Sequence, residues 1–510
     1  MSGQNLRAMC LVRLVVISGF LIAPVSPRAA RLPTYPHTLA DLRARIDAQL
    51  NAPRFNGALW GVQVISLTTG KTIYSNHPDR LMSPASNSKL YTGALALDTL
   101  GGDYRISTPV YATIPPDDFG RIQGDLIISG RGDPSWKAAN FWDNFTPFIS
   151  VLTNAGVRSV NGDLVVDDTF FKGPPTGSSW CLDDLQESFG AEISALSLED
   201  NLVHIHVTPG KKTGDVCQLE VTPADTQITL INRTKTTPAD GGDHLQTYRS
   251  PGSSAYYVFG ELPLGEADED LEVPVPEPAV WFGAALKEAL AQNGIMISGS
   301  VRAVAWPDVP SWSQTNSVKI GEVSSPPLRD LVRGFMKPSQ NLETDLIFEH
   351  VGESVRSVNT PSGASSESLA VTALENFLSG KGVPPDVHFD EGCGLSRNNL
   401  TTAAATAALL EVMATNRWAV DFSNALPIAG VDGSLRRRMR NTPAYQNVRA
   451  KTGTLKWANS LSGYVTTAAG EKLAFSLMLN RFDPPKGENP TEELDAIAEM
   501  LAGWDGRSDE

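Results

Sequence analysis

A serine and a lysine three residues apart are the first residues of this chain that could carry out chemistry together. They are Ser86 and Lys89, and the apolar residues Leu90, Ala94 and Leu97 follow them at the spacing of one helix face. Residues at i and i+3 are neighbours on a helix, so Lys89 can reach the hydroxyl of Ser86. A serine at a helix N-terminus also lies beside backbone N–H groups that favour developing negative charge. The pair therefore predicts a nucleophile and its base.

Two later segments could complete such a site, although each also has an ordinary structural explanation. Ser339 and Asn341 supply a second hydroxyl and an amide, but a serine there is also typical of a helix cap. The Lys-Thr-Gly-Thr stretch at 451–454 follows a short β-compatible run and could be only a strand end and turn. The order of the three segments favours one active site. The base is expected to be a lysine, since the seven histidines are scattered along the chain.

The three segments resemble the S-x-x-K, S-x-N and K-T-G motifs of the penicillin-recognising acyl-serine enzymes. Longer stretches at 392–398, 426–436 and 450–455 are similar to the D-alanyl-D-alanine carboxypeptidase/endopeptidase family, the penicillin-binding protein 4 or class C low-molecular-mass type. This resemblance extends over nearly the whole mature chain. It implies hydrolysis of the terminal D-Ala-D-Ala bond of peptidoglycan stem peptides through an acyl-enzyme on Ser86, with cross-bridge endopeptidase activity as a further expectation. It also implies that β-lactam antibiotics bind covalently as inhibitors, without a cofactor or a metal.

The same resemblance implies a role for each polar residue. Ser339 would relay protons between Lys89 and the leaving group, and Asn341 would orient the peptide amide of the substrate. The backbone N–H groups of Ser86 and Thr454 would form an oxyanion hole, in which each donor typically contributes about 3 kcal/mol. The residues expected to bind substrate on the last segment are Thr452, Gly453 and Thr454, with Lys451 and the two threonines holding the terminal carboxylate.

The two lysines are expected to differ in charge. Lys89 must lose its proton to act as a base, and both desolvation and a nearby cation lower the pKa of a lysine. Lys451 is the expected cation, and its charge would attract the substrate carboxylate. We therefore expect a low pKa for Lys89 and a Lys451 that stays charged.

Asp167 matches an aspartate that the family carries on its inserted domain and that helps to recognise the amino group of a cross-linking diamino acid. An ordinary turn aspartate explains the same residue, and Asp168 lies next to it. The chain also departs from the family at 391–394, where Glu-Gly-Cys-Gly replaces the usual Asp-Gly-Ser-Gly. The simplest structural explanation of Cys393 is a small buried residue. The replacement of Asp-Gly-Ser-Gly by Glu-Gly-Cys-Gly could alter loop packing near the cleft.

The elements that must position these residues indicate an α/β fold. We expect a helix at 39–50, a β-hairpin at 60–74 that leads into the Ser86 helix, strands at 461–465 and 473–480, and a last helix after Pro490. They predict an antiparallel sheet with a helical cluster, and the family resemblance implies that this is a serine β-lactamase/DD-peptidase-like transpeptidase domain, formed by residues 31–105 and 311–510. A mostly β insertion at 106–310 would interrupt it, and the resemblance implies two nested subdomains within the insertion.

The first residues predict export. Arg7 and Arg13 lead into a short apolar run at 14–23, which has the size of a signal peptide, with an uncleaved membrane anchor as the alternative. Residues 1–30 are the expected signal peptide, and no later stretch of the mature chain is expected to span a membrane. The expected location is the periplasm or the cell-wall space. A net charge of −15 and a pI of about 5.0 argue against nucleic acid as a partner.

The cysteines fit an exported protein. Cys10 lies in the leader, and no Cys-x-x-Cys pair or histidine cluster indicates a metal site. In an oxidising compartment Cys181 and Cys217 could form a disulfide, and we expect them to do so, with Cys393 left reduced.

Two other functions remain open from the residues alone. A β-lactamase or esterase could use the same core, but such enzymes usually lack so long an insertion after the nucleophile helix, and no deacylating glutamate can be singled out. A catalytically quiet wall-binding protein is the third possibility. The full set of Ser86, Lys89, Ser339, Asn341 and Lys451 argues against it.

Overall fold

The computed structural model describes residues 35–55, 57–223, 228–310, 312, 317–483 and 489–509. The expected signal peptide at 1–30, with Cys10, lies outside these residues. Within the described ranges, none of the helices combines the length and apolar character that a membrane span requires.

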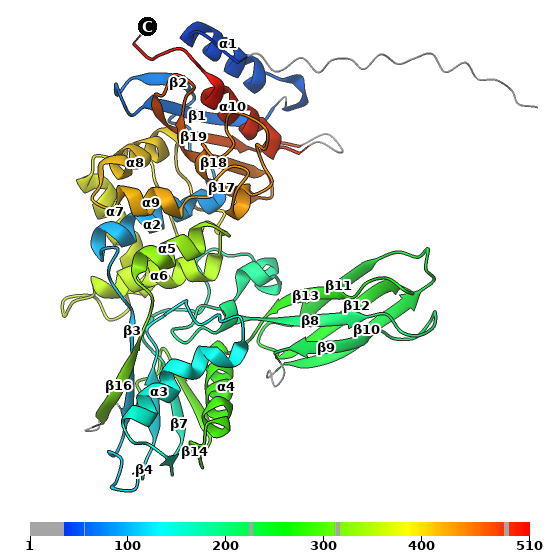
Figure 1. Ribbon diagram of the computed structural model, residues 1–510, viewed down its shortest axis with the longest axis vertical. Coiled ribbons are helices and arrows are strands. Elements are labelled where there is room, and N and C mark those ends of the chain that lie inside the picture. Colours follow the sequence, from blue (N-terminus) through cyan, green and yellow to red (C-terminus); the bar gives the residue numbers. More distant parts are fainter. Residues whose placement is uncertain are drawn as a thin grey trace, which may run out of the picture. The chain divides into compact units, whose positions relative to one another are not determined.

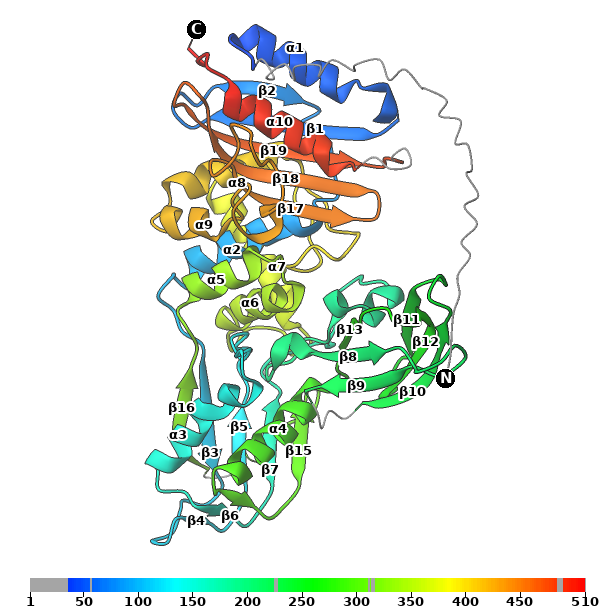
Figure 2. The ribbon, with the colours of Figure 1, turned by 45° about the vertical axis from the view of Figure 1, so that its right-hand side comes forward.

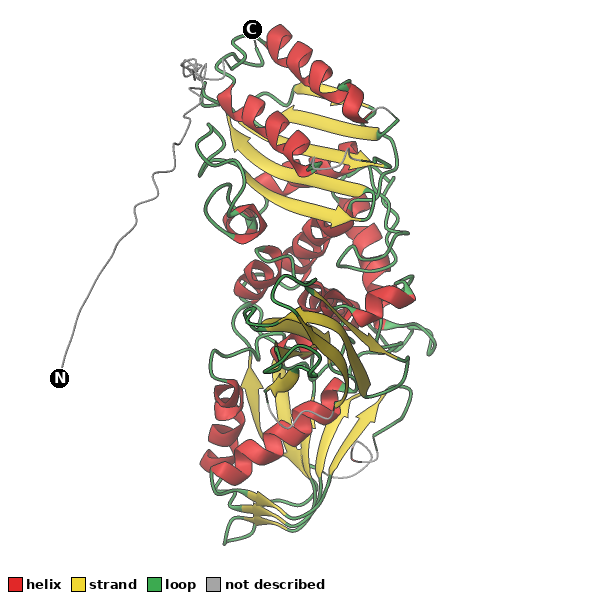
Figure 3. Ribbon diagram, turned by 90° about the vertical axis from the view of Figure 1, so that its right-hand side faces the viewer, coloured by secondary structure: helices red, strands yellow, loops and turns green. Residues whose placement is uncertain are grey.

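The first and last parts of the chain share one antiparallel sheet. Its strands lie in the order β17-β18-β19-β1-β2, so strands from both ends of the sequence are neighbours (Figure 1). Helices α1 and α10 cover one face of the sheet, and α1 packs through Leu42, Ile46 and Leu50 (Figure 3). The bounds are α1 (Leu39–Leu50), β1 (Leu59–Ser66), β2 (Thr72–Asn76), β17 (Arg449–Leu455), β18 (Ala458–Thr466), β19 (Lys472–Asn480) and α10 (Thr491–Gly503).

A cluster of helices lies against the other face of this sheet. Helix α2 runs through its centre, with Leu90, Ala94 and Leu97 fully buried as the sequence predicts. The expected fold class, an antiparallel sheet with a helical cluster, is therefore confirmed. The helices are α2 (Ser88–Thr99), α5 (Leu328–Met336), α6 (Asn341–Ser354), α7 (Ser366–Gly380), α8 (Ala403–Thr415) and α9 (Ala419–Ala425).

The insertion contains a second five-stranded sheet, in the order β15-β7-β5-β3-β16, and a small sheet, β14-β6-β4 (Figure 2). Helix α4 packs against the larger sheet through Phe282, Leu286 and Leu290. The elements are β3 (Ser107–Ala112), β4 (Arg121–Ile122), β5 (Leu126–Ser129), α3 (Thr146–Asn154), β6 (Ser159–Val160), β7 (Leu164–Asp168), α4 (Pro278–Gln292), β14 (Met296–Ile297), β15 (Val301–Ala305) and β16 (Val318–Ser324).

The insertion extends further along the chain than the expected boundary at residue 310. Strand β16 pairs with β3 from Val318 opposite Ala112 to Ser324 opposite Ser107, so it belongs to the inserted sheet. The composition of β16 is that of any short strand, and the sequence does not show with which strand it pairs. Ser311, the first residue of the expected second segment, lies outside the described residues.

Two three-stranded sheets are nested between β7 and α4. Their strand orders are β13-β8-β9 and β10-β12-β11 (Figure 2). Their strands are β8 (Leu202–Thr208), β9 (Gln218–Thr222), β10 (Thr229–Thr237), β11 (His244–Arg249), β12 (Ala255–Pro263) and β13 (Glu269–Pro274).

The expected disulfide is absent. Cys181, Cys217 and Cys393 are all free thiols. Cys217 is buried in the core of the insertion, where its backbone N–H donates to Thr234 Oγ1. Cys181 is only partly buried and precedes the short 3₁₀ turn Leu182–Gln186. The two cysteines therefore serve different local structures, and the prediction of a bridge between them was wrong.

Candidate active site

Ser86 and Lys89 lie on consecutive turns at the start of the central helix. Ser86 is in a short 3₁₀ turn, Ala85–Asn87, which continues directly into α2, and Lys89 is the second residue of α2. Nζ of Lys89 lies 3.1 Å from Ser86 Oγ. Ser86 is partly exposed, whereas the Lys89 side chain is completely buried. The contact between Lys89 and the Ser86 hydroxyl, which the three-residue spacing predicts, is therefore present.

Two glycines allow other segments to approach this turn closely. A Cβ on Gly453, in β17, would lie 2.5 Å from the carbonyl oxygen of Pro84 and 3.1 Å from the Ser86 nitrogen. A Cβ on Gly394 would lie 2.0 Å from the carbonyl oxygen of Ala85. No side chain could be accommodated at these separations, so both positions require glycine. The edge strand β17 can thus run beside the backbone N–H of Ser86, where an oxyanion hole is expected.

Lys89 has three hydrogen-bond partners. Nζ lies 2.7 Å from Asn341 Oδ1 and 2.7 Å from the carbonyl oxygen of Cys393, in addition to the Ser86 hydroxyl. Burial lowers the pKa of Lys89, while Cys393, Asp345 and Glu391 act in the opposite direction. The net effect is a lowered pKa, in the direction that the sequence predicts.

The Glu391 carboxylate is fixed by donors from its own loop. It accepts hydrogen bonds from the backbone N–H of Cys393 and Gly394, from the Cys393 thiol at 2.7 Å and from Asn399 Nδ2 at 2.7 Å. Burial raises the pKa of the Cys393 thiol and of the Asp345 carboxyl well above their usual ranges, which favours the neutral forms of both groups. Cys393 is buried, as expected for a small residue that packs inside the protein, and its thiol is a donor to Glu391. These contacts supply the carboxylate with donors from the protein itself.

Lys451 and Ser339 form a second serine–lysine pair. Lys451 Nζ lies 2.7 Å from Ser339 Oγ and 2.9 Å from the carbonyl oxygen of Thr452. Lys451 is completely buried, and burial together with the positive charge of Lys89 lowers its pKa well below the usual lysine value. The expectation that Lys451 stays charged therefore depends on an anion from the substrate, because no carboxylate in the described residues offsets the desolvation of this lysine.

Thr452 and Thr454 alternate with Lys451 along β17 and have hydrogen-bond partners of their own. Thr452 Oγ1 lies 2.7 Å from the hydroxyl of Ser434, and Thr454, which is exposed, donates from Oγ1 to Asn459 Oδ1. Ser434 is held in place because its backbone N–H donates to the carbonyl oxygen of Lys337. The hydroxyls of Thr452 and Ser434 and the amine of Lys451 thus converge on one end of the edge strand.

Asn341 connects the site to the insertion. Its Oδ1 accepts from Lys89, and its Nδ2 donates to the carbonyl oxygen of Phe189 at 3.0 Å. Phe189 lies in the 3₁₀ turn Ser188–Gly190, immediately after the turn that contains Asp184. The carboxylate of Asp184 in turn pairs with Arg397 at 2.8 Å. The segment 182–190 of the insertion therefore contacts one of the candidate site residues, Asn341.

The structure does not join Asp167 to this group of residues. Asp167 lies at the end of β7, where its carboxylate accepts hydrogen bonds from the hydroxyls of Ser129 and Thr169. It lines a separate cavity of about 400 Å³ with Arg131 and Lys172. None of its hydrogen-bond partners contacts Ser86, Lys89, Ser339, Asn341 or Lys451.

Two residues that the sequence analysis did not assign to the site contact it directly, Ser434 through Thr452 and Phe189 through Asn341. Four others lie around it, since Glu391 and Asp345 act on Lys89 through their charge and Asp184 pairs with Arg397. Ser434 and Arg397 fall in segments that carry the family resemblance, and this location was an available signal. The contact of the Phe189 carbonyl with Asn341 could not be predicted from the sequence, because every residue has a backbone carbonyl.

The structure thus brings together a serine with a lysine one turn away and a second pair, in which Lys451 of the edge strand β17 contacts Ser339 of the turn before α6, an arrangement typical of the penicillin-recognising acyl-serine class. A family model described as the D-Ala-D-Ala carboxypeptidase 3 (S13) family matches residues 42–501. The chain belongs to this family, and the predicted class, a serine-type D-Ala-D-Ala carboxypeptidase, is confirmed.

Individual relatives agree with the family. A D-alanyl-D-alanine carboxypeptidase of an Actinomadura species is 34% identical over 484 residues, which cover 92% of this chain and 86% of the relative. A penicillin-sensitive carboxypeptidase A of Dictyostelium discoideum is 26% identical and covers 87% of each chain. The crystal structure of penicillin binding protein 4 from Haemophilus influenzae superposes with a TM-score of 0.76 at 26% identity, covering 91% of this chain and 97% of that chain.

Proposed function

We propose that this chain releases the terminal D-alanine of peptidoglycan stem peptides through an acyl-enzyme on Ser86. The Ser86 Oγ attacks the carbonyl carbon of the penultimate D-alanine and its proton passes to a base. The C–N bond then breaks, and the leaving amine takes up a proton. Water hydrolyses the resulting ester and regenerates the serine.

The observation that supports this proposal most strongly is the set of partners around Lys89. Two of them, the Asn341 side-chain oxygen and the Cys393 carbonyl, can only accept hydrogen bonds. A neutral lysine amine has two N–H donors and one lone pair. In this neutral form the two donors would satisfy the two carbonyl oxygens, and the lone pair would accept from the Ser86 hydroxyl, which lies 3.1 Å away. We assign Lys89 as the base on this ground.

We propose that the Lys451 side of the site binds the terminal carboxylate. The Thr452 and Ser434 hydroxyls and the Lys451 amine provide donors there, and Thr454 lies next along the strand. A bound carboxylate would raise the pKa of Lys451, so that its positive charge develops when the substrate arrives. That charge would then favour the neutral, basic form of Lys89. Ser339, 2.7 Å from Lys451, would pass a proton to the leaving amine.

Cross-bridge endopeptidase activity is a further part of the proposal. It requires recognition of the amino group of a diamino acid, and a carboxylate of the insertion is the expected partner. Asp167 and Asp184 are the two candidates. The contacts favour Asp184, because it precedes the turn that touches Asn341 and pairs with Arg397 beside the site.

Export to the periplasm or cell-wall space and covalent binding of penicillin also belong to this proposal. Peptidoglycan lies outside the cytoplasmic membrane, and the apolar run at 14–23 supports export. The penicillin-sensitive relative and the acyl-serine site support reaction with β-lactams.

Mass spectrometry after incubation with a labelled penicillin tests the assignment of Ser86. We expect a lasting adduct on the peptide that contains Ser86, and no adduct in a folded Ser86→Ala variant, which also releases no D-alanine from a D-Ala-D-Ala peptide. Rapid hydrolysis of the antibiotic would instead indicate a β-lactamase. Absence of both adduct and turnover in the wild-type protein would indicate a catalytically quiet binding protein.

A further inference from the structure

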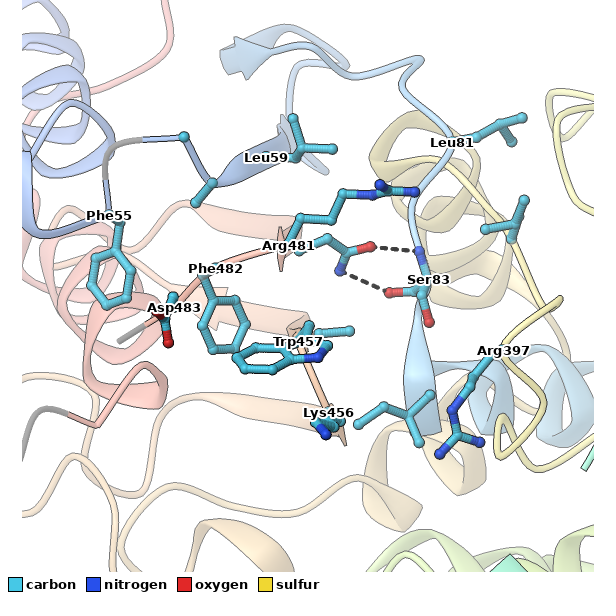
Figure 4. A pocket seen from close by; sticks show the side chains of 16 residues that line it. Phe55, Leu59, Leu81, Ser83, Arg397, Lys456, Trp457, Arg481, Phe482 and Asp483 are labelled. Atoms are coloured by element: carbon cyan, nitrogen blue, oxygen red, sulfur yellow. Dashed lines mark hydrogen bonds between the residues drawn. The ribbon is translucent and has the colours of Figure 1, made fainter. Parts of the chain in front are cut away.

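A cavity of about 720 Å³ begins where the catalytic strand ends (Figure 4). Leu455 and Lys456, which line it, follow Thr454 directly in the chain, and Ser83 on the opposite wall lies three residues before Ser86. Arg397 enters the wall from the loop whose Cys393 carbonyl holds Lys89. Three of the segments that build the catalytic centre therefore continue into this cavity, whose size is within the roughly 300–1,000 Å³ of small-molecule sites.

The walls of the cavity are fixed by hydrogen bonds. The Asn480 side chain bridges the backbone of Ser83, accepting from its N–H at 2.7 Å and donating to its carbonyl at 3.1 Å (Figure 4). Trp457 and Arg481 both have positive φ angles, of 68° and 54°, and the Arg481 N–H donates to the Trp457 carbonyl at 2.7 Å. A bulky residue rarely adopts this backbone conformation, so the surrounding structure must hold Trp457 in this turn. The Trp457 side chain remains 48% exposed.

The chemistry of the lining differs from that of the chain as a whole. The chain has a net charge of −15, yet Lys456, Arg481 and Arg397 border the cavity and Asp483 is the one carboxylate among its lining residues. Arg397 already pairs with Asp184. In the described part of the chain, neither Lys456 nor Arg481 has an ion-pair partner. Lys456 Nζ lies 5.5 Å from the centre of the Trp457 ring, so the cavity combines positive charge that lacks an ion-pair partner among the described residues with the exposed ring of Trp457 and with Phe482.

The direction of the substrate follows from the proposed function, on which this inference rests. With its carboxylate at Thr452 and its scissile carbonyl at Ser86, a peptide lying along the open edge of β17 runs antiparallel to that strand. Its residues on the amino-terminal side of the scissile bond then pass Thr454 and Leu455 and reach Lys456 and Trp457. In an extended peptide each residue advances about 3.3 Å, so the cavity receives the residues before the diamino acid.

We propose that this cavity is a subsite for the muramyl–glutamyl portion of the stem peptide. The γ-linked glutamyl residue leaves a free α-carboxylate, for which Lys456 and Arg481 supply charge-assisted donors. The muramyl sugar presents an apolar C–H face, and the exposed ring of Trp457 provides a flat surface against which it can pack. Binding energy from this remote part of the substrate would increase kcat/KM for long substrates only.

The experiment compares three reactions of the full mature chain. They are D-alanine release from a muramyl pentapeptide, D-alanine release from a diacylated Lys-D-Ala-D-Ala tripeptide, and acylation by penicillin. For a Lys456→Gln/Arg481→Gln double variant, we expect kcat/KM for the muramyl pentapeptide to fall about tenfold or more. The other two reactions should change less than about twofold. Arg437→Gln, which removes an exposed cation outside the cavity, is the matched control.

Trp457 provides a second, independent comparison. Trp457→Gly tolerates the positive φ but removes the ring. Its kcat/KM is measured for the muramyl pentapeptide and for the same pentapeptide without its sugar. Equal losses for the two substrates would mean that the ring does not contact the sugar. We expect a loss for the muramyl substrate alone and its recovery in Trp457→Phe. A third measurement, calorimetric binding of muramyl dipeptide to the penicillin-acylated protein, should show binding that the double variant loses.

The outcomes separate this inference from the proposed function. If wild-type protein neither reacts with penicillin nor hydrolyses the tripeptide, the proposed function fails. If both reactions occur but the muramyl pentapeptide is no better a substrate than the tripeptide, or if all three reactions fall together in the double variant, the subsite is refuted and the proposed function stands.

Discussion

Lys89 and Lys451 have identical side chains and are both completely buried, yet their surroundings are opposite in character. Lys89 contacts two carbonyl oxygens and has the acidic groups Glu391 and Asp345 nearby, which partly offset the effect of burial on its pKa. Lys451 contacts one hydroxyl and one carbonyl, and the charge of Lys89 lowers its pKa further. Burial and the charge of Lys89 thus lower the pKa of Lys451 together, whereas the groups around Lys89 oppose the effect of burial, and the substrate carboxylate would supply an anion next to Lys451.

This difference suggests an order of events. Two adjacent buried cations repel each other, so charge gained by Lys451 on substrate binding favours proton loss from Lys89. Substrate binding would therefore prepare the base as well as position the peptide.

The strongest test of the comparison exchanges each lysine for arginine. Guanidinium does not deprotonate near neutral pH, so Lys89→Arg should lower the rate constant of acylation by a β-lactam about 10²–10⁴-fold, the usual contribution of a general base. Lys451→Arg retains a cation for the carboxylate with altered geometry and should lose only about tenfold. Stopped-flow acylation with one fluorescent penicillin measures both, after circular dichroism and thermal melting show that each variant is folded. Equal losses in the two variants would contradict the division of roles.

A smaller effect on acylation is expected when the carboxylate of Glu391, near Lys89, is neutralised. Glu391→Gln removes a carboxylate that raises the pKa of Lys89 against the effect of burial. The base form of Lys89 then persists to lower pH, so the acid limb of the acylation pH profile should move to lower pH. The glutamine also loses acceptor capacity for the Cys393 and Gly394 N–H groups, which should cost about 1–3 kcal/mol of stability.

The profile is measured as the acylation rate constant between pH 4.5 and pH 9, below the melting temperature of the variant. Glu411→Gln, at an exposed position on α8, is the matched control and should leave the profile unchanged. A shift of the acid limb to higher pH would mean that Glu391 does not act on Lys89 through its charge.

The two aspartates of the insertion offer a comparison of the same kind. Asp184→Asn breaks the pair with Arg397 beside the site and should lower cleavage of diamino-acid cross-bridges about tenfold, with a smaller effect on a short D-Ala-D-Ala peptide. Asp167→Asn alters the contacts with Ser129 and Thr169 and the attraction to Arg131, all away from Ser86 and Lys89, and should change neither reaction appreciably. Chromatography of digested dimeric muropeptides measures the first reaction. A larger loss in Asp167→Asn would return the role to that residue.

The sequence predicted those parts of the site that depend on local spacing. Ser86 and Lys89 meet because three residues make about one helical turn, the helix at 39–50 follows from apolar periodicity, and the fold class follows from the helix and strand pattern together with the family resemblance. The parts that depend on long-range packing were not predicted. Phe189 meets Asn341 across 152 residues of chain through a backbone carbonyl, β16 joins a sheet that begins at Ser107, and the free Cys181 and Cys217 lie in separate local structures.

The smallest effect is expected at Cys393, where the chain departs from its family. Only the Cys393 carbonyl contacts Lys89, and every residue type has that carbonyl. The thiol instead donates to Glu391, and burial raises its pKa, so it acts as a neutral donor. The hydroxyl of Cys393→Ser can make the same hydrogen bond. We therefore expect the acylation rate to change less than about threefold and the unfolding free energy to change by about 1 kcal/mol or less.

Cys393→Ala removes the donor to Glu391 and should destabilise the fold more than Cys393→Ser does. If the serine variant instead loses acylation to the same extent as Lys89→Arg, then the sulfur itself, and not only the backbone at this position, sets the environment of Lys89.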